Sequence, residues 1–276
     1  MALYVVATPI GNLEDITLRA VKVLGEVSLI AAEDTRRTKK LLTHYGIKTP
    51  QVSYHEHNER TRAPMIVERL KRGEDVALVS DAGTPGISDP GYRLVRLASE
   101  ESVPVVAVPG PSAVAAAMSV AGLPTDEFTF KGFVPQSARA RRKFFLTLRG
   151  RARTCVMYES PKRLVATLEC MLDVLGDVEV AVAREMTKVH EEVVRARVAG
   201  ALERFRQAAP RGEITLVVRV PEEASAAGDP AEEMERLLGE GLSLKEVAGA
   251  VADLFGMSGS DAYREALKVR KRLRDL

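Results

Sequence analysis

Residues 76–91, which read VALVSDAGTPGISDPG, indicate how the chain is built. The first part, VALVS, is a continuous apolar run without alternation, as is typical of a strand buried on both faces of a parallel sheet. The second part, SDAGTPGISDPG, mixes Gly and Pro with small hydroxyl residues and ends the strand in a turn. A helix-like stretch follows, so this part of the chain predicts one βα unit.

The same unit recurs in the first part of the chain. Apolar runs of strand length occur at 3–8, 28–32 and 105–108, each followed by a turn rich in Gly, Pro or Asp and by a helix-like stretch. Repeated βα units favour a parallel sheet with helices on both faces. We therefore predict an N-terminal α/β domain over residues 1–120.

After GLPTDEF the rhythm changes, and the pattern predicts a second α/β domain with a mixed sheet over residues 121–221. Strands are expected at 129–134, 154–158, 179–184, 192–198 and 214–220. Helices are expected at 138–148, 161–175 and 200–208.

The last part of the chain is predicted to be a small helical extension over residues 229–276. It follows a linker-like segment, PEEASAAGDP, at 221–230. Ser243 with Glu246 forms a capping-box pattern, a helix should end at Gly256, and Ser258 with Asp261 repeats the box. Two interpretations stay open: a helix-turn-helix-like unit, or a helical hairpin packed on the second domain or on a dimer partner.

Composition narrows the class of protein. The chain has 276 residues, 46% of them hydrophobic and only 5% aromatic, with no Trp. No apolar stretch approaches the roughly 20 residues of a membrane span, and the start carries no basic leader. We expect a soluble, cytoplasmic protein that contacts no membrane. Cys155 and Cys170 stand apart in apolar segments, which favours reduced thiols over a disulfide or zinc site.

Three loops are the candidate ligand site: residues 7–17 (ATPIGNLEDIT), 80–91, and 108–113 (VPGPSA). Open parallel sheets bind ligands at the carboxyl ends of their strands. Gly, Pro and small hydroxyl residues let the backbone approach a ligand closely. Any one loop is equally well explained as a tight turn or helix cap, but three on one sheet edge favour a ligand held mainly by main-chain atoms.

Several common chemistries lack their signatures. There is no GxGxxG after the first strand, no GxxxxGK[ST] and no GxSxG, so dinucleotide, P-loop and hydrolase functions are weakly supported. HEH at 55–57 has no matching carboxylate spacing, which favours solvated or substrate-facing histidines. We predict that no metal is bound.

Basic clusters suggest an anionic partner. Residues 136–153 contain seven Lys and Arg and no Asp or Glu. A second basic cluster lies earlier in the chain, at 36–40. A solvated helix face is the usual explanation of a charge run, but so many cations without an acid should repel one another unless an anion lies nearby. We predict that RNA phosphates contact Arg36, Arg37, Lys39, Arg139, Arg141, Arg142 and Lys143.

Six motifs in order give the chain a family resemblance: VVATPIGNLEDIT, AAEDTRRTKKLL, SDAGTPGISDPG, VPGPSA, YESPKRL and AREMTKVHEE. Together they resemble the ribosomal RNA small-subunit (cytidine 2′-O) methyltransferases of the tetrapyrrole methylase superfamily, over residues 3–220. The resemblance implies two α/β domains, S-adenosylmethionine held folded in the cleft between them, and a homodimer. It also implies methylation of a cytidine ribose in the decoding region of 16S rRNA, as naked RNA or within the small subunit.

The resemblance also implies which residues contact the cofactor. They are Pro9, Asp81, Ala82, Gly83, Thr84, Ile87, Ser112 and Ala113 in the first domain, and Tyr158, Ala183, Ile214 and Thr215 in the second. Porphyrin-modifying relatives carry a GDP-type turn where this chain has Gly83, Thr84 and Pro85. The hydroxyl in place of the carboxylate puts a family-wide role for that acid in doubt.

Methyl transfer to a ribose needs mainly positioning, because the displacement is in line. A 2′-hydroxyl is a poor nucleophile at neutral pH, so a base or an alkoxide-stabilising cation would help. Candidates are Asp34 with its neighbour Glu33, and Glu185 and Lys188 in REMTK. Asp34 is equally well explained as a helix cap or an ion-pair partner of Arg36.

Two other functions stay open from the residues alone. One is a methyltransferase of a tetrapyrrole-type small molecule, since an anionic porphyrin also attracts arginines. The other is a non-catalytic RNA-binding protein of ribosome assembly. Binding of S-adenosylmethionine separates this last function from the two enzymes.

Overall fold

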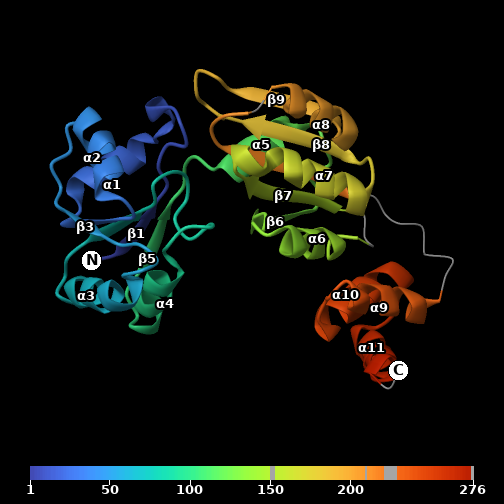
Figure 1. The fold of residues 1–276 in the computed structure, drawn as a ribbon. Coiled ribbons are helices and arrows are strands. Elements are labelled where there is room, and N and C mark those ends of the chain that lie inside the picture. Colours follow the sequence, from blue (N-terminus) through green and yellow to red (C-terminus); the bar gives the residue numbers. More distant parts are fainter. Residues whose placement is uncertain (150–152, 209, 221–228, 275–276) are drawn as a thin grey trace. The chain divides into compact units, whose positions relative to one another are not determined.

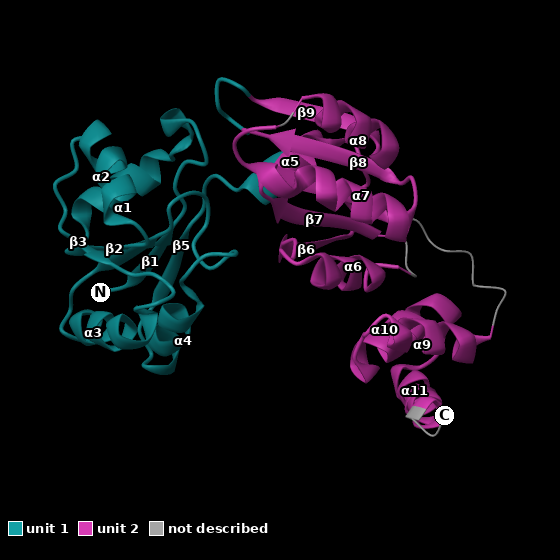
Figure 2. Ribbon diagram, viewed as in Figure 1, with its two compact units in different colours: residues 1–116, 186–190 teal, residues 117–185, 191–276 magenta. Residues whose placement is uncertain are grey.

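The computed structural model describes residues 1–149, 153–208, 210–220 and 229–274. The chain divides into two compact units (Figure 2). The first holds Met1–Ala116 and Met186–His190, and the second holds Ala117–Glu185 and Glu191–Leu276. The sequence pattern did not predict that residues 186–190 belong to the first unit.

The sheet of the first unit is parallel, as predicted, with strand order β3-β2-β4-β1-β5 (Figure 1). Its strands are β1 (Leu3–Val6), β2 (Leu29–Ala32), β3 (Gln51–Ser53), β4 (Val76–Val79) and β5 (Val105–Val108). The chain leaves β1 toward β2 but leaves β4 toward β5, in the opposite direction across the sheet. Open α/β sheets bind ligands at such a switch point.

Helices cover both faces of this sheet. They are α1 (Leu18–Glu26), α2 (Thr35–His44), α3 (Glu59–Lys71) and α4 (Tyr92–Glu100), with a short 3₁₀ helix η1 (Leu13–Asp15). Helix α5 (Ala113–Ala121) follows β5 and continues into the second unit, which begins at Ala117. Successive residues of β4 enter different cores. Val76 and Leu78 pack with α3 and α4, whereas Ala77 and Val79 pack with α1 and α2. This two-sided burial explains why VALVS is apolar without alternation.

The sheet of the second unit is mixed, as predicted, with order β6-β7-β10-β8-β9. Strand β6 runs parallel to β7, and the other neighbours are antiparallel. The strands are β6 (Phe128–Phe133), β7 (Arg153–Glu159), β8 (Glu179–Arg184), β9 (Glu192–Arg197) and β10 (Ile214–Val220). The helices are α6 (Ala138–Leu146), η2 (Pro161–Arg163), α7 (Leu164–Leu175) and α8 (Val198–Gln207). Met157, Val182 and Leu216 share one core with Leu168 of α7 and Phe205 of α8.

The helical extension contains α9 (Pro230–Gly239), α10 (Leu244–Phe255) and α11 (Gly259–Arg274). The capping box of Ser243 and Glu246 is present, and Gly256 ends α10 with φ of 66°, as predicted. The sequence pattern did not separate α9. Residues 221–228 of the predicted linker lie outside the described residues.

The extension packs on the second domain. Its core includes Val247, Val251 and Ala266, and the buried Leu146 of α6 belongs to the same cluster. One of the two open interpretations placed a helical hairpin against this domain, and the packing agrees with it. In the described ranges, no helix combines the length and the apolar character needed to cross a membrane.

Candidate functional site

The three Gly- and Pro-rich loops meet at the carboxyl edge of the first sheet. Thr8 and Gly83 exchange two backbone hydrogen bonds, each with an N···O distance of 2.9 Å. The Thr8 hydroxyl donates to the Ser80 carbonyl at 3.1 Å. The Thr84 hydroxyl donates to the Pro111 carbonyl at 3.4 Å and so joins the loop at 80–91 to the loop at 108–113. The expectation that these loops share one edge is confirmed.

Gly83 lies where these loops approach one another. Its φ of +77° is in the left-handed region that favours glycine. A Cβ at this position would lie 3.6 Å from Cγ2 of Ile10 and 3.8 Å from the carbonyl oxygen of Pro111. A larger side chain would therefore be directed toward both neighbouring loops.

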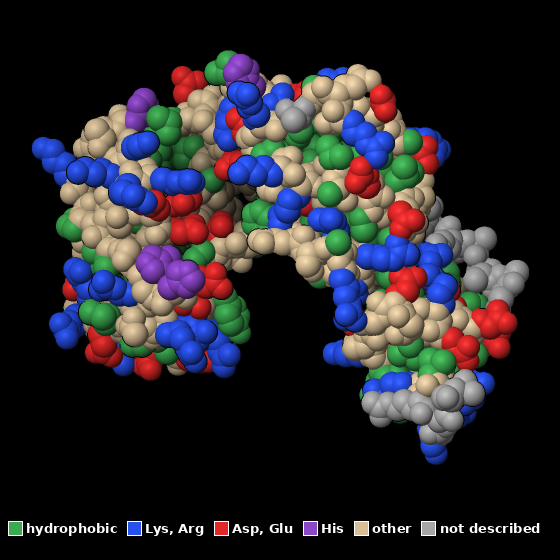
Figure 3. Space-filling model, in the orientation of Figure 1, with side chains coloured by type: hydrophobic (Ala, Val, Ile, Leu, Met, Phe, Trp, Pro, Cys, Tyr) green, Lys and Arg blue, Asp and Glu red, His purple; other side chains and the backbone are tan. Residues whose placement is uncertain are grey.

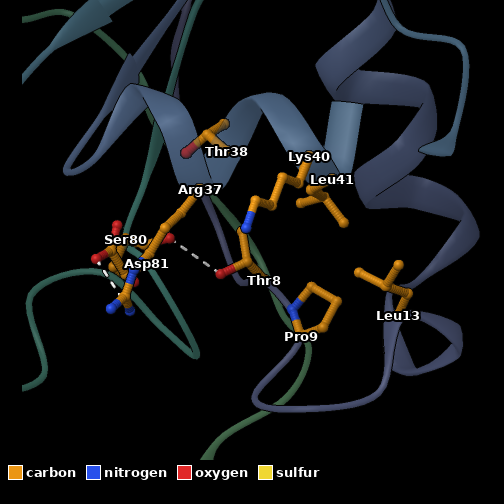
Figure 4. Close-up of a pocket in the computed structure, with 9 residues that line it drawn as sticks. All are labelled: Thr8, Pro9, Leu13, Arg37, Thr38, Lys40, Leu41, Ser80 and Asp81. Carbon is orange, nitrogen blue, oxygen red and sulfur yellow. Dashed lines mark hydrogen bonds and ion pairs between the residues drawn. The ribbon is translucent and has the colours of Figure 1, made fainter. Parts of the chain in front are cut away.

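A pocket of about 200 Å³ opens beside the loops at 7–17 and 80–91 (Figure 4). It is lined by Thr8, Pro9, Leu13, Arg37, Thr38, Lys40, Leu41, Ser80 and Asp81. The Arg37 guanidinium pairs with the Asp81 carboxylate at 3.4 Å, and Lys40 extends from α2 toward Thr8. The pocket thus contains Pro9 and Asp81, two predicted cofactor residues, and Arg37, a predicted RNA residue.

Three carboxylates gather at this edge: Glu33, Asp81 and Asp89. The amide of Asp81 donates to the Glu33 carboxylate at 3.1 Å. Burial, followed by the negative charges of Glu33 and Asp81, raises the pKa of Asp89 to about 7, although a hydrogen bond from Ser80 opposes the rise. Burial also raises the pKa of Glu33, against a hydrogen bond from the Asp81 backbone. The edge therefore suits a positively charged ligand.

Asp34 has a structural role at the start of α2. Its carboxylate accepts hydrogen bonds from the Arg36 amide at 2.8 Å and from the Arg36 guanidinium at 2.9 Å. These hydrogen bonds, side chain first, lower the pKa of Asp34 to about 2. The cap and ion-pair interpretation of Asp34 is confirmed, and such a weak base is a poor proton acceptor at neutral pH.

The other predicted cofactor residues of the first unit lie in the same loops. Ala82 and Ile87 follow Asp81 in the loop at 80–91, and the Ile87 side chain is exposed. Ser112 directly precedes α5, where its carbonyl accepts a hydrogen bond from the Ala116 amide at 2.9 Å. Ala113 is the first residue of that helix. Their contact with a cofactor stays a prediction.

In the second unit, three predicted cofactor residues form one row across the sheet. Thr215 of β10 is in register with Tyr158 of β7 and with Ala183 of β8. Residues in register on neighbouring strands point to the same face. Ile214 points to the other face, into the core under α7 and α8, so only its backbone is available on the side of Thr215.

Glu185 and Lys188 belong to different units. The Glu185 carboxylate accepts a hydrogen bond from the Glu213 amide at 2.9 Å and so holds a turn of the second unit. Lys188 lies against the first loop: a Cβ on Gly11 would be 2.5 Å from its Cγ. The Asn12 amide also donates to the Thr187 hydroxyl at 3.0 Å. Lys188 is thus the candidate that the structure brings to the loop containing Pro9.

The basic stretch 136–153 has acidic neighbours that are distant in sequence. Lys143 pairs with Glu246 of α10 at 2.8 Å, and Arg142 pairs with Glu240 at 2.9 Å and with Asp173 of α7. Further pairs join Arg149 to Glu233 at 3.8 Å and Arg153 to Asp253 at 3.4 Å. Figure 3 shows blue and red side chains intermingled where α6 adjoins α9 and α10.

The argument that these cations need RNA as their anionic neighbour is therefore wrong. Acids of the helical extension already supply the negative charge, and Arg141 is buried rather than presented to solvent. Arg36 pairs with Asp34 at the first cluster. Lys39 and Arg139 are exposed and have no ion pair within the described ranges. RNA contact at any of these residues stays a prediction.

The histidines of HEH do not assemble a metal site. The rings of His55 and His57 lie 6.0 Å apart, centroid to centroid, in an edge-to-face arrangement. Within the described residues, no three His, Cys, Asp or Glu side chains group as metal ligands. Binding without metal stays a prediction.

Comparison with known proteins assigns the fold and loops to a family. Residues 2–202 match the model of the tetrapyrrole (corrin/porphyrin) methylases, and the chain belongs to this family. It resembles the solved structure of uroporphyrin-III C-methyltransferase from Thermus thermophilus with a TM-score of 0.56 and 19% identity, over 78% of this chain and 93% of that one. At this identity the likeness shows the fold alone.

Closer relatives share more of the sequence. The chain is 50% identical to ribosomal RNA small subunit methyltransferase I of Thermotoga maritima, over 78% of this chain and 97% of the relative. It is 44% identical to the protein of the same name from Halalkalibacterium halodurans, over 95% of this chain and 93% of the relative. The second match includes the helical extension.

Proposed function

We propose that the protein transfers a methyl group from S-adenosylmethionine to the 2′-hydroxyl of a cytidine in the decoding region of 16S rRNA. The observation that carries this proposal is the 44% identity to a relative named as a small-subunit rRNA methyltransferase, over 95% of the chain. Methyltransferases of this family use S-adenosylmethionine, and a related uroporphyrin-III C-methyltransferase was solved with S-adenosyl homocysteine.

The residues at the edge of the first sheet fit this cofactor chemically. Its sulfonium and amino groups are positively charged, and Asp81 lies beside Glu33 and Asp89, whose raised pKa values a nearby cation would lower. Gly83 keeps side chains out of the place where three loops meet. The pocket of about 200 Å³ is large enough for part of such a molecule. We propose that Pro9, Asp81, Ala82, Gly83, Thr84, Ile87, Ser112 and Ala113 hold the cofactor, with Tyr158, Ala183, Ile214 and Thr215 from the second domain.

When bound, S-adenosylmethionine supplies a methyl carbon that an oxygen nucleophile attacks in line with the departing sulfur. The protein has to hold the ribose oxygen in line and stabilise the charge that develops on it. We assign the second task to Lys188, because its stem lies against Gly11 in the first loop. Glu185 supports the turn at Glu213 and Asp34 caps α2, so both rank below Lys188.

The RNA partner is proposed from the relatives and from the exposed cations that stay unpaired in the described part of the chain, Lys39 and Arg139. A cytoplasmic location follows from a ribosomal substrate, and the homodimer implied by the family resemblance remains part of the proposal. Arg142 and Lys143 form ion pairs with acids of the helical extension. These two residues therefore contact phosphate only if their acidic partners are displaced.

Radioactive methyl transfer tests this function. The protein and tritiated S-adenosylmethionine are incubated with small ribosomal subunits, with protein-free 16S rRNA, or with uroporphyrinogen. We expect label in RNA and none in the tetrapyrrole. Label in the tetrapyrrole alone would instead support a small-molecule methyltransferase. Cofactor binding without any transfer would contradict the enzyme function, and absence of cofactor binding by calorimetry would leave only an RNA-binding role.

A further inference from the structure

Strand β6 contains a bulge that changes the direction of one aromatic side chain. Phe130 is in register with Val156 of β7, and Phe133 is in register with Tyr158. Between these pairs β6 advances three residues while β7 advances two. Gly132, with φ of +68°, provides the extra residue. Without the bulge, Phe130 and Phe133 would point to opposite faces; with it, both share the face of Tyr158.

These three rings form a cluster. The ring of Tyr158 lies 5.1 Å from that of Phe130 and 5.2 Å from that of Phe133, centroid to centroid. The Phe133 side chain is 60% exposed at the edge of the sheet. Burial cannot explain why a large apolar ring is held there in a fixed orientation. The row of Ala183, Thr215 and Tyr158 thus ends at an aromatic face open to solvent.

One exposed cation follows the strand that carries Tyr158. Lys162 lies in η2, three residues past the end of β7, and its exposed side chain has no ion pair within the described ranges. Lys131 lies in the bulge opposite Met157 and so belongs to the other face of the sheet, where its charge acts on Cys155. Exposed rings beside unpaired cations are the combination with which proteins bind single-stranded nucleic acid, because bases stack on the rings and phosphates contact the cations.

We propose that Phe133, supported by Tyr158 and Phe130, stacks on a nucleobase of the RNA substrate, with Lys162 on an adjacent phosphate. This proposal rests on the proposed RNA function for its substrate. The adenine of the cofactor offers the same flat ring. The positive charge of Lys162 favours RNA, because adenine itself carries no phosphate.

The test measures the affinity of the full-length protein for a fluorescein-labelled single-stranded oligocytidine and for a matched oligonucleotide whose central nucleotides lack bases. Phe133→Leu keeps the apolar volume but removes the ring, so it should weaken oligocytidine binding roughly 5- to 100-fold and leave the abasic oligonucleotide unaffected. Phe133→Tyr should bind like the wild type. Phe128→Leu is the matched control, since Phe128 is 46% exposed on the same strand.

Three outcomes would overturn the proposal: unchanged oligocytidine affinity in Phe133→Leu, an equal loss in Phe128→Leu, or a loss confined to S-adenosylmethionine affinity measured by calorimetry. The last outcome would assign the ring to the adenine. Methyl transfer to small subunits is assayed separately with the wild type. If that transfer fails while the base-dependent loss is observed, the proposed function is wrong and the stacking site stands.

Discussion

Asp89 makes the stability of the protein depend on pH, and Asp89→Asn should remove that dependence. In the unfolded chain the carboxyl has its ordinary pKa of 3.8, whereas in the folded protein burial and then the charges of Glu33 and Asp81 raise the pKa to about 7. Between these values the folded state binds more protons than the unfolded state. The free energy of unfolding of the wild type therefore falls as pH rises through this window and is level above it.

The magnitude follows from the shift. About three pKa units correspond to roughly 4 kcal/mol over the whole window from 3.8 to about 7. The part of the window above about pH 5, together with screening of a half-buried carboxyl, reduces the expected effect to about 2 kcal/mol. Urea unfolding at about pH 5 and about pH 8 measures it. The difference between the free energies of unfolding of Asp89→Asn and of the wild type should shift in favour of the variant by about 2 kcal/mol from about pH 5 to about pH 8.

The control for this experiment is Asp34→Asn. The pKa of Asp34 is lowered to about 2, so the stability that this carboxylate contributes is present above pH 3.8 and is lost only as pH falls toward 2. Its replacement should change stability equally at both test conditions. Two results would contradict a raised pKa of Asp89. One is that Asp89→Asn keeps the pH dependence of the wild type; the other is that its free energy of unfolding, relative to that of the wild type, increases toward acid pH.

Three further perturbations test the site and the packing. Gly83→Val places a branched side chain at φ of +77° beside Ile10, so calorimetry should detect no S-adenosylmethionine binding while circular dichroism stays native; unchanged affinity would rule out this pocket. Lys188→Met should lower kcat for methyl transfer at saturating substrates far more than Glu185→Gln, and equal rates would remove the assignment of Lys188. Leu146→Ala should lower the free energy of unfolding by roughly 2–4 kcal/mol and make the extension more sensitive to protease, whereas a neutral effect would contradict its packing on α6.

Much of the fold follows from local patterns in the sequence. Runs such as VALVS are apolar throughout because alternate residues of β4 enter two different cores, and this signature predicts a parallel sheet without knowledge of strand order. Strand β3 escaped prediction because it has only three residues, all half-buried. The return of residues 186–190 to the first unit depends on contacts with Gly11 and Asn12, which no local pattern records.

The sequence was sufficient to predict which loops form the candidate site, but not which of its carboxyl groups have a raised pKa. Parallel strands bring their following loops to one edge, so residues around Pro9, Gly83 and Ser112 could be named together. Asp89 was missed because its raised pKa depends first on burial and then on Glu33, more than fifty residues earlier in the chain, and neither is visible in the local sequence.

The basic stretch was misinterpreted for the same physical reason. Its charges were counted within one segment, but their partners come from elsewhere in the chain. Arg142 pairs with Glu240, 98 residues away, and Lys143 with Glu246. Local charge density therefore did not reveal that the helical extension neutralises these cations.

The proposed function requires that this chain methylate a ribose of small-subunit RNA. To test it, the protein and S-adenosylmethionine are incubated with small subunits from a strain lacking the methyl group, the RNA is digested to nucleosides and the product is identified by mass spectrometry, with Gly83→Val as the inactive control. We expect 2′-O-methylcytidine from the decoding region with the wild type alone. A methyl group on a base, on another nucleoside, or on no RNA at all would contradict it.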